Sequence, residues 1–207
     1  MIDREAVSGK RSAPDERDAD EERDTALVRQ LREGAPAAAQ ELCDRFGPKL
    51  FAYAAARFAA DQEVAKDLMI QSLAQAACNI GSFNPNKSTL TTWLYGIARQ
   101  RIWYELRQRM RQKSIPTSVQ SSLEALAETP DNRDMAAEVL ARIEAERKIA
   151  DLAATLSGIE FDVLVLSCLD NLPARQIGQI VGRSERAVHS LLHRARMKAR
   201  ERLVRDE

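Results

Sequence analysis

Apolar side chains recur at every fourth position from residue 90 to residue 106. The repeat consists of Leu90, Leu94, Ala98, Ile102 and Leu106. A four-residue spacing places side chains on one face of an α-helix, whereas a half-buried strand alternates every two residues. The preceding segment, residues 84–88, is polar and contains a proline, where a helix does not readily run. The repeat therefore predicts a helix that begins near Thr91 and packs one face against a core.

A second set of side chains lies on a different face of the same predicted helix. It consists of Trp93, Gln100, Tyr104, Arg107 and Arg111. Aromatic rings stack on unpaired bases and guanidinium groups neutralise phosphates. Residues 99–113 also contain six basic residues and one acid. Half-buried aromatics beside a solvated basic face would give a similar pattern, but the separation of this stripe from the apolar face favours contact with nucleic acid.

The composition of the whole chain predicts an all-α protein. Its 207 residues are 44% hydrophobic and 30% charged but only 5% aromatic, which is typical of globular proteins. No alternating β-branched run occurs, no apolar run approaches the roughly 20 residues of a membrane span, and no apolar signal segment is present. We therefore expect a cytoplasmic protein with no membrane segment. The three cysteines lack metal-ligand spacing, so we expect small buried side chains and no metal or other cofactor.

Changes in composition along the chain predict two small helical domains joined by a flexible linker. Residues 1–24 carry a net charge of −4 and few large apolar side chains, so we expect a disordered acidic tail. Residues 25–113 form the predicted first domain. Residues 114–134, rich in Ser, Thr and Pro, form the predicted linker, and residues 135–207 form the second domain. The formal net charge of zero is thus the sum of acidic and basic segments, and the basic segments set the local electric field that a ligand meets.

Further helices are predicted from the apolar periodicity. In the first domain they span residues 36–58, with a possible kink at Pro48, and residues 61–80, with Gly81 as a C-terminal cap. In the second domain they span residues 159–169, 173–181 and 184–204.

Residues 173–196 predict a helix-turn-helix. A short helix ends at Gly182, and Ser184 is a good N-cap for the next helix. The second helix of such a motif enters the DNA major groove with its N-terminal residues on the bases. The side chains that we expect to contact DNA are Arg183, Ser184, Glu185, Arg186, His189, Ser190, His193, Arg194 and Arg196. The two histidines have a zinc-ligand spacing, but no third ligand is nearby.

Two motifs resemble those of bacterial sigma factors of the extracytoplasmic-function type. In the first domain, Phe83, Pro85, Trp93-Leu94 and residues 97–99 resemble the family pattern F-D-P-x-x-G-x-x-x-x-W-L-x-x-I-A-R. In the second, Gly182, Val188, Ser190 and residues 192–196 resemble G-x-S-x-x-T-V-K-S-R-L-H-R-A-R. The resemblance extends over about residues 27–204, and the two motifs occur in the family's order around a linker.

This resemblance implies that the chain binds core RNA polymerase and directs it to promoter DNA, with no catalytic chemistry of its own. The first domain would recognise and melt the −10 element, and the second would read the −35 element. An anti-sigma factor is implied as a possible partner. The side chains implied at the −10 element are Asn84, Lys87, Ser88, Trp93, Arg99, Gln100, Trp103, Tyr104, Arg107 and Arg111.

The segment that resembles the family's polymerase-docking helix departs from the family pattern. The family's D-A-E-D-L-V-Q-E corresponds to residues 64–71, where only Asp67 keeps its acid. The candidate polymerase contacts are Lys66, Asp67, Leu68, Ile70 and Gln71. The loss of acids predicts weak binding of core polymerase unless a partner or added charge assists, for example phosphorylation of Ser72.

Two other functions remain open at this point. The chain could be a stand-alone regulator that uses the helix-turn-helix, or a degenerate sigma-like regulator or interaction module without productive polymerase binding. The aromatic stripe favours an initiation factor, because a reader of intact duplex has no need of base-stacking rings.

Overall fold

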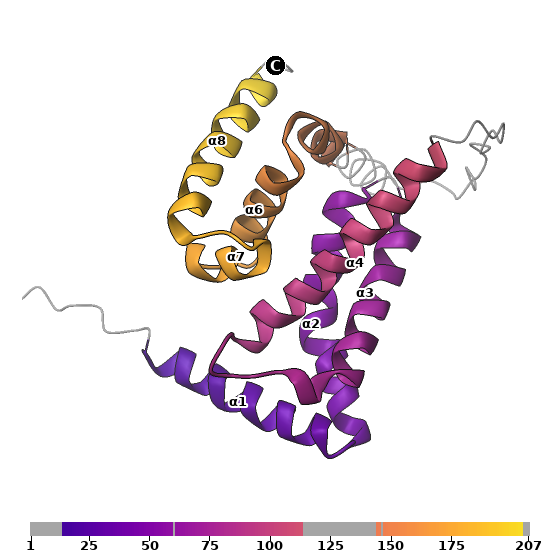
Figure 1. Ribbon diagram of the computed structural model, residues 1–207, viewed down its shortest axis with the longest axis vertical. Helices are drawn as coiled ribbons and strands as arrows, with labels where there is room; N and C mark the ends of the chain where they lie inside the picture. The colour runs from indigo at the N-terminus through magenta and orange to yellow at the C-terminus, as the bar shows by residue number, and fades with distance from the viewer. Residues whose placement is uncertain (1–13, 60, 114–143, 146, 205–207) are drawn as a thin grey trace, which may run out of the picture.

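The computed structural model describes residues 14–59, 61–113, 144–145 and 147–204. Within these ranges the regular secondary structure is entirely helical, which confirms the predicted fold class. The predicted linker and residues 1–13 of the predicted tail lie outside the described residues. Figure 1 shows the helices in two groups, α1 to α4 and α6 to α8.

The first group consists of four α-helices and one short 3-10 helix. The helices are α1 (Pro14–Arg32), α2 (Pro36–Arg57), α3 (Gln62–Cys78), η1 (Ile80–Ser82) and α4 (Leu90–Lys113). Helix α3 packs against both α2 and α4, and α1 packs against α2 (Figure 1). The apolar repeat of α4 faces the core as predicted, with Leu90, Leu94 and Ile102 almost wholly buried. The rings of Tyr53 and Tyr95 meet edge to face in the same core, with centroids 5.5 Å apart.

The second group consists of α6 (Gly158–Leu169), α7 (Ala174–Val181) and α8 (Glu185–Val204), which pack on one another. Residues 147–155 are also helical and precede α6. Helix α6 begins with a capping box, in which Ser157 and Glu160 bond to each other's backbone N–H groups. The core of this second group contains Phe161, Leu166 and other apolar side chains from all three helices.

A close turn joins α7 to α8, as the sequence predicted. Gly182 ends α7 with a φ of 68°, in the left-handed region that glycine adopts without strain. Gly178 lets the turn approach the helix, since a Cβ at this position would lie 2.5 Å from the carbonyl oxygen of Arg183. The Oγ of Ser184 accepts a hydrogen bond from the N–H of Ala187 at 3.3 Å, which confirms the predicted N-cap.

The structure differs from the sequence predictions at several places. Helix α1 begins at Pro14, so residues 14–24 are helical rather than disordered. An ion pair of 2.7 Å between Asp24 and Arg45 joins this acidic segment to α2. Helix α3 ends at Cys78 with Asn79 as its cap, so Gly81 does not cap it. The cysteines are all exposed, not buried; they are Cys43, Cys78 and Cys168.

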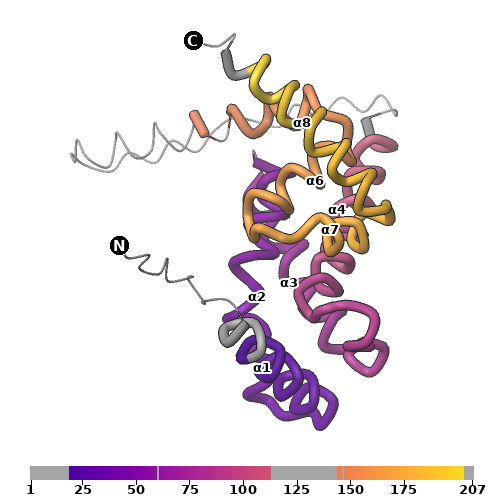
Figure 2. The backbone as a smooth tube through the Cα atoms, turned by 90° about the vertical axis from the view of Figure 1, so that its left-hand side faces the viewer, coloured from indigo at the N-terminus to yellow at the C-terminus, as the bar shows by residue number. Residues whose placement is uncertain are grey.

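The two groups of helices contact each other directly. Helix α7 lies against α4, and α6 lies against α2. Figure 2 shows α6, α7 and α8 next to the part of the tube that α4 occupies. This contact decides which of the predicted DNA-binding side chains are accessible.

Candidate nucleic-acid interface

The loop before α4 presents polar side chains next to an aromatic pair. Phe83 is buried and packs against Trp93, with ring centroids 5.4 Å apart. The Oδ1 of Asn84 accepts a hydrogen bond from the N–H of Asn86 at 2.9 Å, which closes a turn. Asn84 and Lys87 are exposed at this turn, and Ser88 is half-buried. The loop is thus anchored by Phe83 while its polar side chains face solvent.

The predicted stripe on α4 is accessible over most of its length. Gln100, Tyr104, Arg107 and Arg111 are exposed, and Tyr104 has 57% of its surface exposed. The Tyr104 hydroxyl accepts a hydrogen bond of 2.7 Å from the side-chain amide of Gln108. Trp93 is half-buried against Phe83 at the start of the helix. Because more than half of the surface of Tyr104 is exposed, its ring is accessible to a base that could stack on it.

Two other side chains predicted to bind the −10 element, Arg99 and Trp103, form hydrogen bonds with the second domain instead. The Nε of Arg99 and the Nε1 of Trp103 each donate to Oδ2 of Asp162 at 2.9 Å. The guanidinium of Arg57 donates to Oδ1 of the same carboxylate at 3.1 Å. Asp162 has no exposed surface. Burial, and then the charge of Asp162, raise the pKa of the neighbouring Tyr53 phenol, so that its hydroxyl stays protonated.

The sequence prediction assigned Arg99 and Trp103 to DNA and did not include Asp162. The two arginines of this cluster are 105 and 63 positions from Asp162 along the chain. A single acid within the apolar run of residues 161–169 was the signal that could have found it, because a carboxylate among buried side chains needs cationic partners.

The predicted recognition helix presents all its predicted DNA contacts to solvent. Every one is exposed: Arg183, Ser184, Glu185, Arg186, His189, Ser190, His193, Arg194 and Arg196. The buried side chains Val188, Leu191, Leu192 and Ala195 form the opposite face of α8. The polar and apolar faces therefore divide as a helix docked in a DNA groove requires.

Helix α8 is held on α6 by an ion pair between a buried glutamate and a partly exposed lysine. The carboxylate of Glu160 accepts hydrogen bonds from Nζ of Lys198 at 2.8 Å and from Oγ of Ser157 at 2.8 Å. Glu160 as a whole has only 4% of its surface exposed. The hydrogen bond from Lys198 lowers the pKa of Glu160 from 4.5 to about 2, against the opposing effect of burial. The pair fixes the position from which the recognition helix projects.

The candidate polymerase-binding face lies on α3, with one exception to the prediction. Lys66, Asp67, Ile70 and Gln71 are exposed, and Ile70 has 50% of its surface exposed. Leu68, in contrast, is buried in the core at 5% exposure, because it lies on the opposite face of the helix. It therefore supports the surface from behind rather than contacting a partner.

The suggested phosphorylation of Ser72 does not fit the structure. Ser72 is 1% exposed, and its Oγ donates a hydrogen bond of 2.6 Å to the carbonyl of Leu68. A phosphate at this position would bury two negative charges in the core of the first domain. The residue follows Leu68 by four positions and so shares its buried face.

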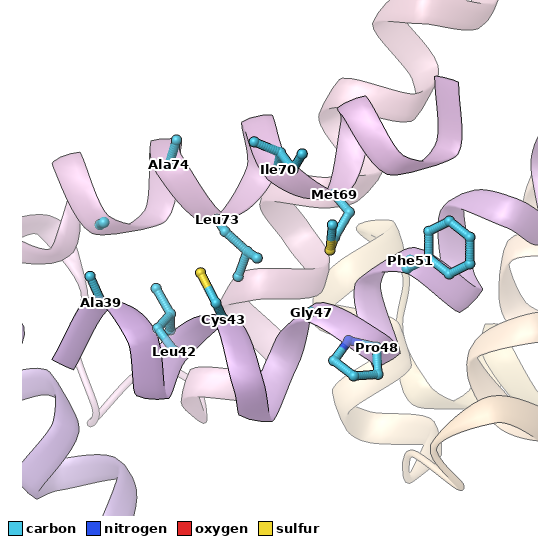
Figure 3. Close-up of a pocket in the computed structure, with 11 residues that line it drawn as sticks. Ala39, Leu42, Cys43, Gly47, Pro48, Phe51, Met69, Ile70, Leu73 and Ala74 are labelled. Carbon is cyan, nitrogen blue, oxygen red and sulfur yellow. The ribbon is translucent and has the colours of Figure 1, made fainter. Parts of the chain in front are cut away.

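An apolar groove of about 640 Å³ lies between α2 and α3, beside this face (Figure 3). Sequence reasoning missed it. Met69, Ile70 and Leu73 line it from α3, and the small residues Ala39, Cys43 and Gly47 line it from α2. Figure 3 shows the side chains of Cys43 and Leu73 directed into the space between the helices. The four-residue spacing of the small residues was a signal for it, because that spacing leaves one face of α2 without bulk.

Two family models match the chain. Sigma-70 region 2 matches residues 42–112, and Sigma-70, region 4 matches residues 146–198. Together these regions cover more than half of the chain and include most of α2 to α4 and of α6 to α8.

The chain belongs to the sigma-70 family. It is a sigma factor, as its two motifs predicted, and it directs promoter-specific initiation by core RNA polymerase. This family is a class of non-enzymatic transcription factors.

Two solved structures share the fold of this sigma factor. CnrH in complex with the cytosolic domain of CnrY has a TM-score of 0.63 and 21% identity, covering 89% of this chain and 99% of that chain. The sigma factor RpoE in complex with the anti-sigma factor NepR from Bartonella quintana has a TM-score of 0.60 and 22% identity, covering 81% and 98%. A search of curated proteins finds no match.

The described part of the sigma factor holds no group of three or more His, Cys, Asp or Glu side chains placed to bind a metal ion. Among its helices, none has the length and apolarity that crossing a membrane requires.

The lowered pKa of Glu160 predicts a pH-dependent stability of the sigma factor. Because the folded pKa is about 2 and the ordinary value is 4.5, this carboxylate stabilises the fold fully above pH 4.5. That contribution is lost as pH falls from 4.5 toward 2. Glu160→Gln should lower the thermal unfolding midpoint at pH 7, and the difference from the parent protein should shrink across this window. Circular dichroism measures both midpoints.

Glu144→Gln is the matched control for this measurement. Glu144 pairs with Lys148 at 2.7 Å, but its side chain is 65% exposed, so water screens the pair. A midpoint difference for Glu160→Gln that is the same at pH 7 and pH 3 would contradict the assigned role of the carboxylate.

Proposed function

We propose that the two domains of this sigma factor divide the promoter between separated strands and intact duplex. The loop at residues 84–88 and the stripe on α4 bind the opened −10 element, and the exposed face of α8 binds the −35 element. The observation that carries this proposal is the difference between the two surfaces. Exposed aromatic and basic groups line α4, whereas the exposed face of α8 has charged, hydroxyl and imidazole groups but no Phe, Tyr or Trp side chain.

The chemistry of each surface supports its assigned element. Stacking on an aromatic ring needs a base that has left the duplex, and α4 supplies such a ring in Tyr104 with 57% of its surface exposed. Arg186 and Glu185 lie in the first turn of α8, where arginine can pair with guanine and glutamate can accept from cytosine.

The exposed face of α3 is proposed to bind core RNA polymerase through Lys66, Asp67, Ile70 and Gln71. Leu68 is not part of this surface, because it is buried in the core. The face has few acids for a partner with basic docking residues, and Ile70 offers an apolar contact beside Asp67. This composition supports a docking surface that binds core polymerase weakly, and a titration with core polymerase measures that affinity.

An anti-sigma partner is also proposed. It is supported by the two similar structures, one of which contains the anti-sigma factor NepR and the other the cytosolic domain of CnrY. Proteolytic cleavage confined to residues 114–134, the proposed linker, would support the division into domains at residues 25–113 and 135–207.

Alanine at Tyr104 and at Arg186 should affect different steps of initiation. Tyr104→Ala removes the ring and should reduce open complexes while leaving binding to duplex −35 DNA unchanged. Arg186→Ala should weaken that duplex binding by roughly 1–3 kcal/mol, the scale of one base contact. Permanganate footprinting measures strand opening, and a duplex titration with the polymerase holoenzyme measures binding.

Two variants serve as controls for this pair. Tyr104→Phe keeps the ring and should retain strand opening, and Arg200→Ala removes an exposed charge near the other end of α8. Equal losses from Tyr104→Ala and Arg186→Ala in both measurements would contradict the proposed division.

Restoring an acid on α3 should strengthen binding of core polymerase. Lys66→Glu places a carboxylate where the family motif has one, and should raise affinity roughly 2- to 5-fold, the scale of an exposed ion pair. A titration of labelled sigma factor with purified core polymerase gives the affinity. Nanomolar binding by the unaltered protein, with no gain in the variant, would exclude a weakened docking face.

A further inference from the structure

Asp162 is the central residue of the contact between the two domains. Its carboxylate is bonded to Arg57 of α2 at 3.1 Å and to Arg99 and Trp103 of α4 at 2.9 Å. All three partners belong to the first domain, while Asp162 belongs to α6 in the second. A buried carboxylate that loses its cationic partners is strongly unfavourable unless it regains water. Asp162 is therefore satisfied either in this contact or in solvent.

The arginine opposite Asp162 is also buried by the contact. The side chain of Arg57 has 7% of its surface exposed. Its guanidinium lies 4.1 Å from the ring centroid of Phe161 and donates to the carbonyl of Gly158, both in α6. Charge pairing, backbone bonding and ring stacking thus converge on one guanidinium, which makes the contact specific.

The second domain covers part of the proposed −10 surface. The indole of Trp103 lies so close to α6 that a Cβ at Gly158 would be 2.1 Å from its Cη2 atom. The side-chain amide of Gln179 in α7 donates to the carbonyl of Lys87 in the loop before α4, at 3.2 Å. An ion pair of 2.9 Å between Lys49 and Asp170 adds a further link.

This arrangement does not allow both promoter elements to be bound at once. Elements centred at −10 and −35 are about 25 base pairs apart, or roughly 85 Å along duplex DNA. Helix α8, with 20 residues, is only about 30 Å long. Since Gln179 touches the loop at Lys87, the two proposed DNA-binding surfaces are adjacent here. The domains must separate before they bind the two elements together.

We propose that Asp162 holds this sigma factor in a closed state that is unable to engage a promoter, and that breaking its bonds to Arg57, Arg99 and Trp103 opens the molecule. The proposal rests on the proposed function, because Arg99 and Trp103 become available to −10 DNA only when α6 leaves them. The switch lies in the contact between the domains, and Asp162 acts as a positioning residue that touches no DNA.

The native cysteines allow a direct measurement of opening. Cys78→Ser leaves Cys43 in the first domain and Cys168 in the second, both exposed. A donor and an acceptor dye on these two positions report the distance between the domains by energy transfer. In this labelled protein, Asp162→Asn should lower the ratio of closed to open molecules by roughly 5- to 150-fold, the usual range of coupling between two states.

Gly158→Ala tests the same contact without changing a charge. Its methyl group would collide with Trp103, which belongs to the other domain, so the variant should also open the molecule. It keeps the experiment decisive if Asp162→Asn does not fold, which circular dichroism would reveal. Asp151→Asn is the matched control, because Asp151 pairs at 3.1 Å with Arg202 of its own domain and should leave energy transfer unchanged.

The outcomes separate this proposal from the proposed function. Lower energy transfer in Asp162→Asn and Gly158→Ala, with the control unchanged, supports the closed state. Energy transfer equal to that of the parent protein in both folded variants overturns it, whether or not the protein starts transcripts. With purified core polymerase, Asp162→Asn should also give more open complexes at limiting sigma factor. Opening without that gain would overturn the claim that closure restrains promoter binding.

Discussion

The carboxylate of Asp162 has no exposed surface, and two guanidinium groups and an indole N–H from the other domain satisfy it. The relative position of the two DNA-binding surfaces depends on this cluster, because the carboxylate would otherwise be buried without partners. The cluster also uses Arg99 and Trp103, which the sequence motif assigns to the −10 element. One set of side chains therefore belongs to both the closed contact and the proposed promoter surface.

The contact between the domains also brings basic side chains together. The formal net charge of the chain is zero, but Arg99, Arg107 and Arg183 line one cavity of about 460 Å³ between the domains. Like charges brought together in this way repel one another. The negative charge of Asp162 offsets part of that repulsion at the centre of the contact. Within the second domain, Glu160 has the corresponding role toward Lys198 of α8.

The helices of both domains, and the turn between α7 and α8, were predictable because their signals in the sequence are local. The four-residue repeat fixed the buried face of α4, and Gly182 with Ser184 marked the turn before α8. A lone acid in an apolar run marked Asp162, but its partners were not predictable, because they depend on how two domains meet and no spacing along the chain records that contact. Leu68 and Ser72 are both buried because they lie four positions apart on the inward face of α3, which the match to the family motif does not show.

Transcription by purified core polymerase tests the central claim, a division of the promoter between two helical modules, most directly. A pool of promoter templates, with start sites mapped from the transcripts, should reveal start sites that depend on this sigma factor and share two upstream elements, with strand opening confined to the one nearer the start. Failure to start transcripts on any template, under conditions where a control sigma factor succeeds, would contradict the account.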